Sequence, residues 1–232
     1  MTTLDHARPG ARHSERVTTA YLAFLGILLA FGIDVALPAF DDIEADLSTG
    51  GASISLIGTL YFLGMAAGQI VYGPVADRFG RRPALLVGLG LYGGGALMSA
   101  VAPSFGFLLG ARLLWGLGAA APGALRTAIA RDLYEGDQMA RVVTIVTAVF
   151  MIGPIFVPII GQTILTVAPW PAVFAAAAAL AAVAVAWTLW FGESLAAEHQ
   201  RPLRAGPLIE AARVVVQTRA TIGHIAAQTL SG

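Results

Sequence analysis

The 232-residue sequence contains no cysteine and no lysine, and charged residues make up only 12% of it. Without cysteine it can form neither disulfides nor thiolate metal sites, and it has no cysteine nucleophile. Soluble domains carry about 25% charged residues, so a water-soluble fold could not hide a composition that is 57% hydrophobic. The formal net charge is zero, which gives no reason to expect nucleic acid or another polyanion as a partner.

Signatures of catalysis and cofactor binding are missing as well. The sequence has no glycine-rich phosphate loop, no catalytic triad and no pair of carboxylates spaced for acid–base chemistry. The four histidines are scattered, and none has a second ligand at metal-binding spacing: His6, His13, His199 and His224. We therefore expect no enzymatic activity, no cofactor and no metal site.

What the sequence does contain is six long apolar stretches. A helix needs about 20 apolar residues to cross about 30 Å of hydrocarbon. We predict spanning helices at residues 18–38, 54–74, 83–102, 107–130, 142–166 and 171–191. The predicted fold class is an all-α membrane protein, with a six-helix transmembrane bundle over residues 18–191.

The remaining segments complete the predicted organisation. We expect residues 1–17 to form a cytoplasmic tail and residues 192–219 a cytoplasmic linker. Within the linker, residues 208–217 are predicted to be either an amphipathic surface helix or a plain solvated segment. The apolar run at 220–232 spans only about 20 Å as a helix, which is too short to cross. It is predicted to be the truncated start of a seventh helix, so that the chain is the front half of a longer protein.

Arginine marks alternate connections between the apolar stretches. Arginines precede the first stretch and follow the second, fourth and sixth, whereas the other three connections have none. The connection after the first stretch is acidic instead, with Asp41, Asp42, Glu44 and Asp46. Because basic residues remain on the cytoplasmic side, the N-terminus is predicted to be cytoplasmic. Arginine as the only strong base, with abundant alanine and glycine, suggests a bacterium and hence its inner membrane.

The most specific motif lies at the end of the second stretch. It reads Gly73, Pro74, Val75, Ala76, Asp77, Arg78, Phe79, Gly80, Arg81, Arg82. Gly73 and Gly80 allow a tight reversal, Pro74 is expected to stop the helix, and Asp77 supplies an acceptor among the arginines. Topology alone does not need an acid inside a basic turn, so we expect this cluster to fix helix packing.

This motif resembles the cytoplasmic loop signature of the major facilitator superfamily. Arg112, Gly116 and Gly118 are similar to the arginine-x-x-x-glycine-x-glycine pattern of that family, although Trp115 replaces a common glutamine. Residues 128–134 look like the bicyclomycin-resistance type of drug:proton antiporter. In the fifth stretch a set of residues resembles the antiporter signature, with Gln162 in place of its usual final glycine: Gly153, Pro154, Pro158 and Gly161.

The resemblance covers residues 18 to 195 and implies the N-terminal half of a twelve-helix transporter. Its expected activity is proton-coupled export of drug-like small molecules across the cytoplasmic membrane. The implied partners are the lipid bilayer, protons, a small-molecule substrate and the missing C-terminal half. It also implies that Asp132 joins the loop motif in a cytoplasmic gating cluster. The alternatives are a major facilitator transporter of another substrate class, such as a metabolite exporter or a uniporter, and an inactive fragment or non-transporting six-helix protein.

Charged residues inside the apolar stretches are candidates for the transport site. Each costs about 2.5–3.5 kcal/mol near a helix centre. Asp34 and Arg112 lie at similar depths in the outer half of their stretches, and the resemblance places both helices on a central cavity. We predict that they form a proton- and substrate-binding pair. The alternatives are that Asp34 extends to the outer surface and that Arg112 is a structural anchor. Arg126, near the cytoplasmic end of its stretch, is expected to extend to that surface and is left out of the site.

Other positions are assigned from residue type and spacing. Gly116, Ala119 and Gly123 form a stripe of small residues that permits close helix packing or a cavity wall. Pro154 and Pro158 each remove a backbone donor, so with Gly153 and Gly161 they predict a hinge-like bend in the fifth stretch. The polar residues expected to line the cavity are Tyr61, Gln69 and Gln162.

Overall fold

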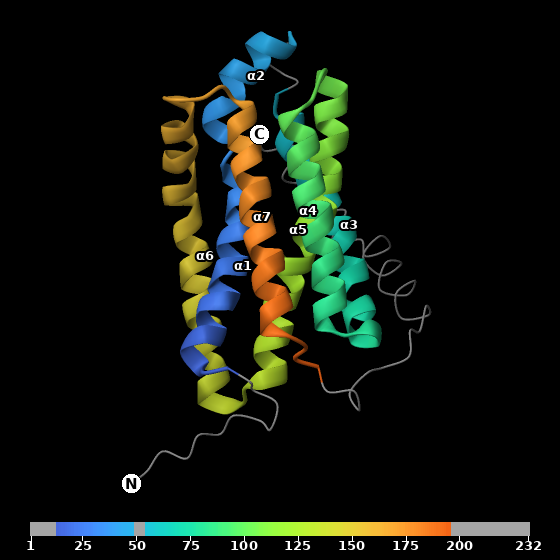
Figure 1. Ribbon diagram of the computed structural model, residues 1–232, viewed down its shortest axis with the longest axis vertical. Coiled ribbons are helices and arrows are strands. Elements are labelled where there is room, and N and C mark those ends of the chain that lie inside the picture. Colours follow the sequence, from blue (N-terminus) through green and yellow to red (C-terminus); the bar gives the residue numbers. More distant parts are fainter. Residues whose placement is uncertain (1–12, 49–53, 196–232) are drawn as a thin grey trace, which may run out of the picture. The chain divides into compact units, whose positions relative to one another are not determined.

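The computed structural model describes residues 13–48 and 54–195, which form helices and short connections (Figure 1). The long helices are α1 (Glu15–Asp34), α3 (Leu56–Phe79), α4 (Arg81–Ala100), α5 (Phe105–Leu133), α6 (Gly136–Leu165) and α7 (Pro171–Phe191). Between α1 and α3 lie the short 3₁₀ helix η1 (Leu37–Ala39) and α2 (Phe40–Leu47). The predicted surface helix at 208–217 and the partial helix at 220–232 lie outside the described residues, as do most of the predicted tail and linker.

Six helical segments are long and apolar enough to cross a membrane, and within the described ranges there is no β-strand. The predicted all-α, six-span class is therefore confirmed. The expected stop at Pro74 is wrong, because α3 continues through Pro74 to Phe79. A proline inside a helix removes one hydrogen bond without necessarily ending the helix. The chain turns instead at Gly80, whose φ of 101° lies in the region that favours glycine.

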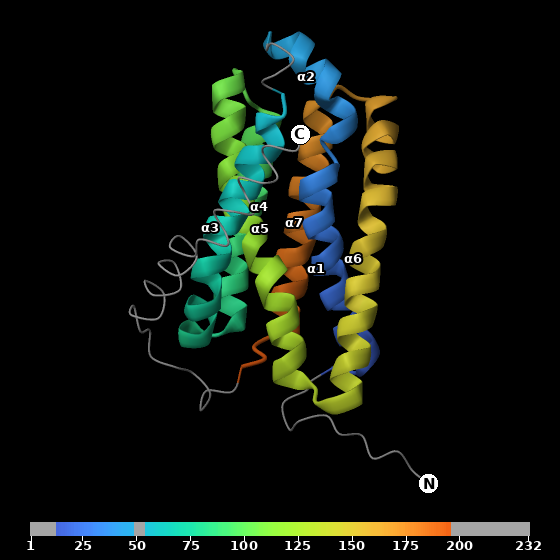
Figure 2. The same ribbon diagram turned by 180° about the vertical axis from the view of Figure 1, so that it is seen from behind.

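Consecutive spans run in opposite directions, so the bundle has two chemically different ends (Figures 1 and 2). The start of α1, the α3–α4 and α5–α6 turns and the end of α7 share one end, which we call the arginine-rich end. The other end, which carries α2 with Asp41 and Asp42 in its first turn, is called the acidic end. This arrangement follows the predicted alternation of arginine. That the arginine-rich end faces the cytoplasm stays a prediction.

Helix α5 lies between α3, α4 and α1 and packs against all three. Glycines bring the backbones together. A Cβ atom on Gly64 of α3 would overlap the carbonyl oxygen of Leu113, and one on Gly116 of α5 would overlap the carbonyl oxygen of Tyr61. Part of the predicted small-residue stripe therefore serves helix packing. Gly123, by contrast, has only a leucine side chain nearby.

Helix α6 packs along α1 through the two glycines of the predicted hinge. A Cβ atom on Gly153 would overlap that of Ala30, and one on Gly161 would lie 2.7 Å from the carbonyl oxygen of Val35. The helix is unbroken from Gly136 to Leu165 although Pro154 and Pro158 lie inside it. The two glycines therefore fix the approach of α1 and α6, while bending at the prolines stays a prediction.

Candidate functional site

Arg112 lies buried where α1, α3 and α5 meet, with 1% of its surface exposed. Its Nε donates to the carbonyl oxygen of Ile57 at 3.3 Å, and its Nη1 donates to that of Gly32 at 3.2 Å. The guanidinium also lies over the rings of Tyr61 and Trp115, with its Cζ 4.7 Å from each ring centroid. Such cation–π contacts are strongest when the cation is removed from water. Arg112 is thus held by backbone carbonyls and aromatic faces.

The position of Gly32 explains why this arginine needs no carboxylate. Gly32 belongs to the last turn of α1, where carbonyl groups lack a helical N–H partner and the helix carries partial negative charge. Asp34, two residues further on, is buried as well. Although both side chains belong to the described part of the chain, no ion pair or hydrogen bond joins Asp34 to Arg112. The expected direct pair is therefore replaced by a contact through the α1 backbone.

Two polar atoms beside Arg112 have no hydrogen-bond partner among the described residues: the Tyr61 hydroxyl and the Trp115 Nε1. The hydroxyl lies against Gly32, where a Cβ atom would overlap it. Buried unpaired polar groups cost about 1–3 kcal/mol each, so most buried polar groups in proteins have a partner. Tyr61 thus lies at the buried junction rather than on an open wall. The other two expected cavity residues, Gln69 and Gln162, are exposed on α3 and α6.

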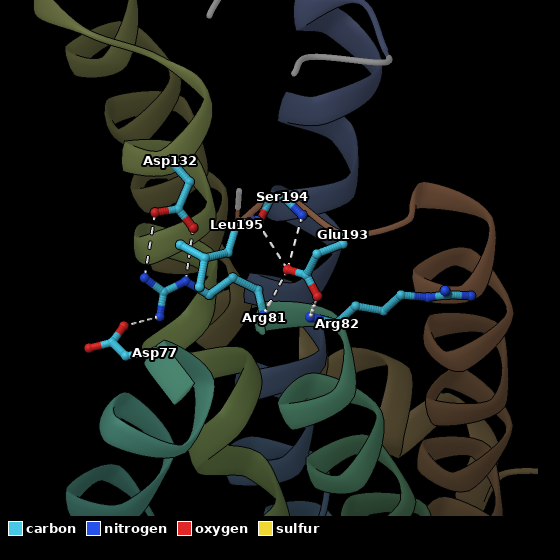
Figure 3. A network of polar contacts seen from close by, with 7 residues as sticks. All are labelled: Asp77, Arg81, Arg82, Asp132, Glu193, Ser194 and Leu195. Atoms are coloured by element: carbon cyan, nitrogen blue, oxygen red, sulfur yellow. Dashed lines mark hydrogen bonds and ion pairs between the residues drawn. The ribbon is translucent and has the colours of Figure 1, made fainter. Parts of the chain in front are cut away.

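At the arginine-rich end, Arg81 of α4 binds two acidic residues (Figure 3). Its Nη1 lies 2.5 Å from Asp77 Oδ1 on α3. Its Nε donates to Asp132 Oδ2 on α5 at 2.8 Å, and its Nη2 donates to Oδ1 at 3.5 Å. The side chains of Arg81 and Asp132 are only 11% and 16% exposed. Ion pairs shielded in this way are less screened than surface pairs, so this charge cluster fastens three helices together.

Glu193, just after α7, also joins this region, and no role was assigned to it from the sequence. Its Oε1 accepts the backbone N–H of Arg81 at 2.8 Å, and its Oε2 accepts that of Arg82 at 3.1 Å. These are the first N–H groups of α4, which have no partner within the helix. A negative charge is also favoured at a helix N-terminus. Glu193 therefore caps α4 from the far end of the sequence.

The remaining residues of the predicted gating motif differ in their contacts. Gly80 leaves room for the cap, since a Cβ there would lie 2.5 Å from Glu193 Oε2. Arg82 donates through Nη2 to the carbonyl oxygen of Leu189 at 3.1 Å. Arg78 is exposed, and a Cβ on Gly73 would meet open space. The structure thus brings together Asp77, Gly80, Arg81, Arg82 and Asp132, while Arg78 and Gly73 stand apart from the cluster.

Comparison with known protein families and sequences gives consistent results. The sequence model of the Major Facilitator Superfamily matches residues 22–229. A bicyclomycin resistance protein homolog of Haemophilus influenzae is 32% identical over 94% of this chain and 56% of its own length. A chloramphenicol resistance protein of Pseudomonas aeruginosa is 33% identical over 77% of this chain and 43% of its own. The multidrug resistance protein MdtL of Escherichia coli is 32% identical over 65% of this chain and 38% of its own length.

Solved structures show the same arrangement of helices. The human organic anion transporter MFSD10 (TETRAN) superposes with a TM-score of 0.64 at 23% identity, over 82% of this chain and 51% of that one. The xylose transporter XylE from E. coli superposes with a TM-score of 0.69 at 16% identity, over 78% of this chain and 49% of that one. At these identities the likeness concerns the fold. The chain spans about half the length of the curated relatives it matches.

Proposed function

This chain belongs to the major facilitator superfamily, and from that membership we propose that it is the N-terminal half of a proton-coupled exporter of drug-like small molecules. The names of its relatives, which speak of resistance to bicyclomycin, to chloramphenicol and to multiple drugs, support export as the direction of transport. The activity is proposed for a longer protein of the relatives' length. Its place would be the bacterial inner membrane, with the arginine-rich end in the cytoplasm.

The observation that carries the proposal is the buried Asp34, which lies two residues after the Gly32 carbonyl that holds Arg112. Two carbonyl oxygens and two rings hold the guanidinium of Arg112 in place, and an arginine keeps its charge at any physiological pH. Asp34 is buried and has no ion-pair partner among the described residues. A carboxyl group in this position can take up a proton, or bind a substrate cation in exchange for it. That competition couples a proton gradient to export.

The charge cluster of Asp77, Arg81 and Asp132 supplies the second part of the mechanism. It joins α3, α4 and α5 at the arginine-rich end. Transporters of this kind work by alternating access, in which helix bundles rock about a site near the middle of the membrane. We assign the cluster to the gating region at the cytoplasmic side, where its ion pairs hold these three helices together while the bundle rocks as a unit.

The test is transport by the longer protein in proteoliposomes, with a fluorescent cationic dye and an imposed pH gradient. Asp34→Asn should abolish gradient-driven dye movement while the protein still inserts into the membrane. Asp42→Asn, at an exposed position of α2, is the matched control and should transport normally. Gradient-driven transport by Asp34→Asn at the wild-type rate would contradict the assignment of the proton site. Absence of transport by the wild-type protein would instead favour the non-transporting alternative.

A further inference from the structure

Arg126 of α5 places its charged group inside the bundle. A Cβ atom on Gly26 of α1 would lie 2.8 Å from Arg126 Nη1, so the guanidinium lies directly against the backbone of Gly26. The Cζ atom of Arg126 lies 4.6 Å from the ring centroid of Phe150 on α6. Gly26 is the twelfth of the 20 residues of α1, close to the middle of that helix. The guanidinium therefore occupies the junction of α1, α5 and α6 near mid-span.

The direction of the side chain follows from helix geometry. Long side chains in a helix lean toward its N-terminus. Arg126 lies seven residues before the end of α5 at Leu133, so its side chain extends back toward the middle of the span and away from the arginine-rich end. The expectation that it reaches the nearby surface is therefore wrong.

The guanidinium of Arg126 is poorly compensated. Its Nε and Nη1 are buried without a hydrogen-bond partner, and none of the ion pairs between described residues includes it. Phe150 offers only the face of an aromatic ring. A cation in an apolar span is costly unless it is paired, and buried donors without acceptors add to that cost. The residue as a whole remains partly exposed, and Nη2 is not among its buried unpaired atoms, so an acceptor from outside the described chain can approach the guanidinium from the Nη2 side.

The charges within the described spans do not balance around Arg126. Away from the arginine-rich end, the other charged residues of the long helices are Asp34, at the end of α1, and Arg112. Asp34 lies eight residues from Gly26, about 12 Å along α1 at 1.5 Å per residue, which is too far for a direct ion pair. Arg112 is about 21 Å away along α5 and has its own acceptors. Among the residues that the structure describes, the region around Arg126 thus has a positive charge and no anion.

We propose that Arg126 binds a carboxylate group of the transported compound, whose apolar body lies against Phe150 and the exposed apolar face of α6. A guanidinium presents parallel N–H groups that match a carboxylate. The exposed residues that continue this face are Met151, Ile152, Ile155, Phe156 and Ile159. This inference rests on the proposed transport function and adds amphipathic compounds that carry a carboxylate to the substrates, beside the cations that Asp34 can bind. The same carboxylate chemistry is also available from an acidic side chain in the rest of the longer protein, and the experiment separates the two sources.

The probes are naphthalene-2-carboxylate and naphthalene-2-carboxamide, which share shape but differ in charge. Their binding is measured by calorimetry on the longer protein in lipid nanodiscs. The wild-type protein should bind the carboxylate at least about tenfold more tightly than the amide, a ratio that corresponds to about 1.4 kcal/mol. Arg126→Gln should remove this preference, and Arg126→Lys should keep part of it. Arg131→Gln, at an exposed position on the same helix, should leave it unchanged.

Equal affinity of the wild-type protein for both probes would overturn the proposal, and this comparison needs no variant to fold. Equal weakening of both probes by Arg126→Gln would also contradict it. If the 232-residue chain shows the preference and the longer protein does not, an acidic side chain of the remainder occupies Arg126, and the substrate assignment is wrong. The binding measurement needs no proton gradient. A failure of gradient-driven transport would therefore contradict the proposed function without deciding whether Arg126 binds a carboxylate.

Discussion

The carboxylate of Glu193 accepts the backbone N–H of Arg81 at 2.8 Å across 112 positions of the sequence. Its second oxygen accepts the next N–H, that of Arg82. The end of α7 is thereby joined to the start of α4, beside the ion pairs of Arg81 with Asp77 and Asp132 (Figure 3). Arg81 of α4 thus connects to three other segments. Its side chain binds α3 and α5, and its backbone N–H binds the residue that follows α7.

Glu193→Gln should destabilise the chain through loss of this cap. The amide keeps one acceptor oxygen but loses the charge that interacts with the N-terminus of α4. Since the site is exposed, the loss should be about 0.5–1 kcal/mol, seen as a lower Tm of the purified chain in detergent. Glu44→Gln, at a carboxylate of α2 without a hydrogen bond among the described residues, is the control. Equal Tm values for the two variants would contradict the cap.

The two acids bound to Arg81 should contribute unequally. The Asp132 side chain is 16% exposed and accepts two donors of the guanidinium, whereas the Asp77 side chain is 44% exposed and accepts one. Asp132→Asn should cost about 1–3 kcal/mol, and Asp77→Asn about 0.2–1 kcal/mol, as for exposed pairs. Denaturant unfolding of the purified variants measures both. The reverse order would show that burial does not set the strength of these contacts.

In the longer protein, Asp77→Asn should slow transport more than it weakens substrate binding. The reason is that Asp77 belongs to the charge cluster at the arginine-rich end and lies far from Asp34 and Arg112. Dye transport and dye binding, measured on the same proteoliposome preparation, give the two quantities. If Asp77→Asn transports at the wild-type rate, the cluster has no role in transport and serves only to set the membrane topology.

Arg112→Lys should lose stability although the charge is kept. An ammonium group cannot lie flat on the rings of Tyr61 and Trp115 while donating to the carbonyls of Gly32 and Ile57. One carbonyl would then be left unpaired, at a cost of about 1–3 kcal/mol. Thermal unfolding detects this difference, with Arg78→Lys at an exposed position as control. Unchanged stability in Arg112→Lys would mean that charge alone holds this junction.

Gly116→Ala should prevent normal packing of α3 against α5, because the added methyl group would overlap the Tyr61 carbonyl oxygen. Gly110→Ala on the same helix meets nothing within 4 Å and should fold normally. Yield of monodisperse protein in gel filtration compares the two. Equal yields would show that α3 and α5 can separate without loss of the fold.

The cysteine-free sequence makes membrane orientation directly measurable. A single Ala45→Cys at the exposed acidic end should react with a membrane-impermeant thiol reagent added outside intact cells, and Arg131→Cys at the arginine-rich end should not. Reporter fusions after residues 80, 136 and 205 should likewise report a cytoplasmic location. Labelling of Arg131→Cys but not of Ala45→Cys would show that the topology is the opposite of the proposed one.

The spans and part of the candidate site could be predicted because they depend on residue types that are visible in the sequence. Apolar runs of sufficient length predict the spans directly. An acid placed among arginines indicated that Asp77 and Arg81 lie in one cluster, and family resemblance added Asp132. The stop at Pro74 was wrong, because a proline's missing N–H costs one hydrogen bond while the turn itself needed the conformation of Gly80.

The contacts that were missed involve backbone groups or the direction of a side chain. Arg112 binds carbonyl oxygens and Glu193 binds N–H groups, and every residue has a carbonyl group, so no residue type reveals such a partner. Asp34 was therefore expected to pair with Arg112, since it was the visible opposite charge. The prediction for Arg126 was wrong because it considered only the distance of the residue from the end of α5. It did not consider that side chains in a helix point toward the N-terminus of the helix.

The glycine contacts of α5 also have a consequence for synthesis at the ribosome. The partners that α5 meets through Gly64 and Gly116, and through Gly118 against the backbone of Tyr92 on α4, all precede it in the chain. The trio α3, α4 and α5 can therefore assemble as soon as α5 leaves the translocon. Helix α1 can meet α5 through the contact of Arg112 with Gly32, but it also packs on α6, whose Gly153 lies against Ala30, and on α7, whose Thr188 shares a hydrogen bond with Tyr21. The contacts thus allow the second, third and fourth spans to pack together first, whereas the first span completes its packing only after both the fifth and the sixth are made.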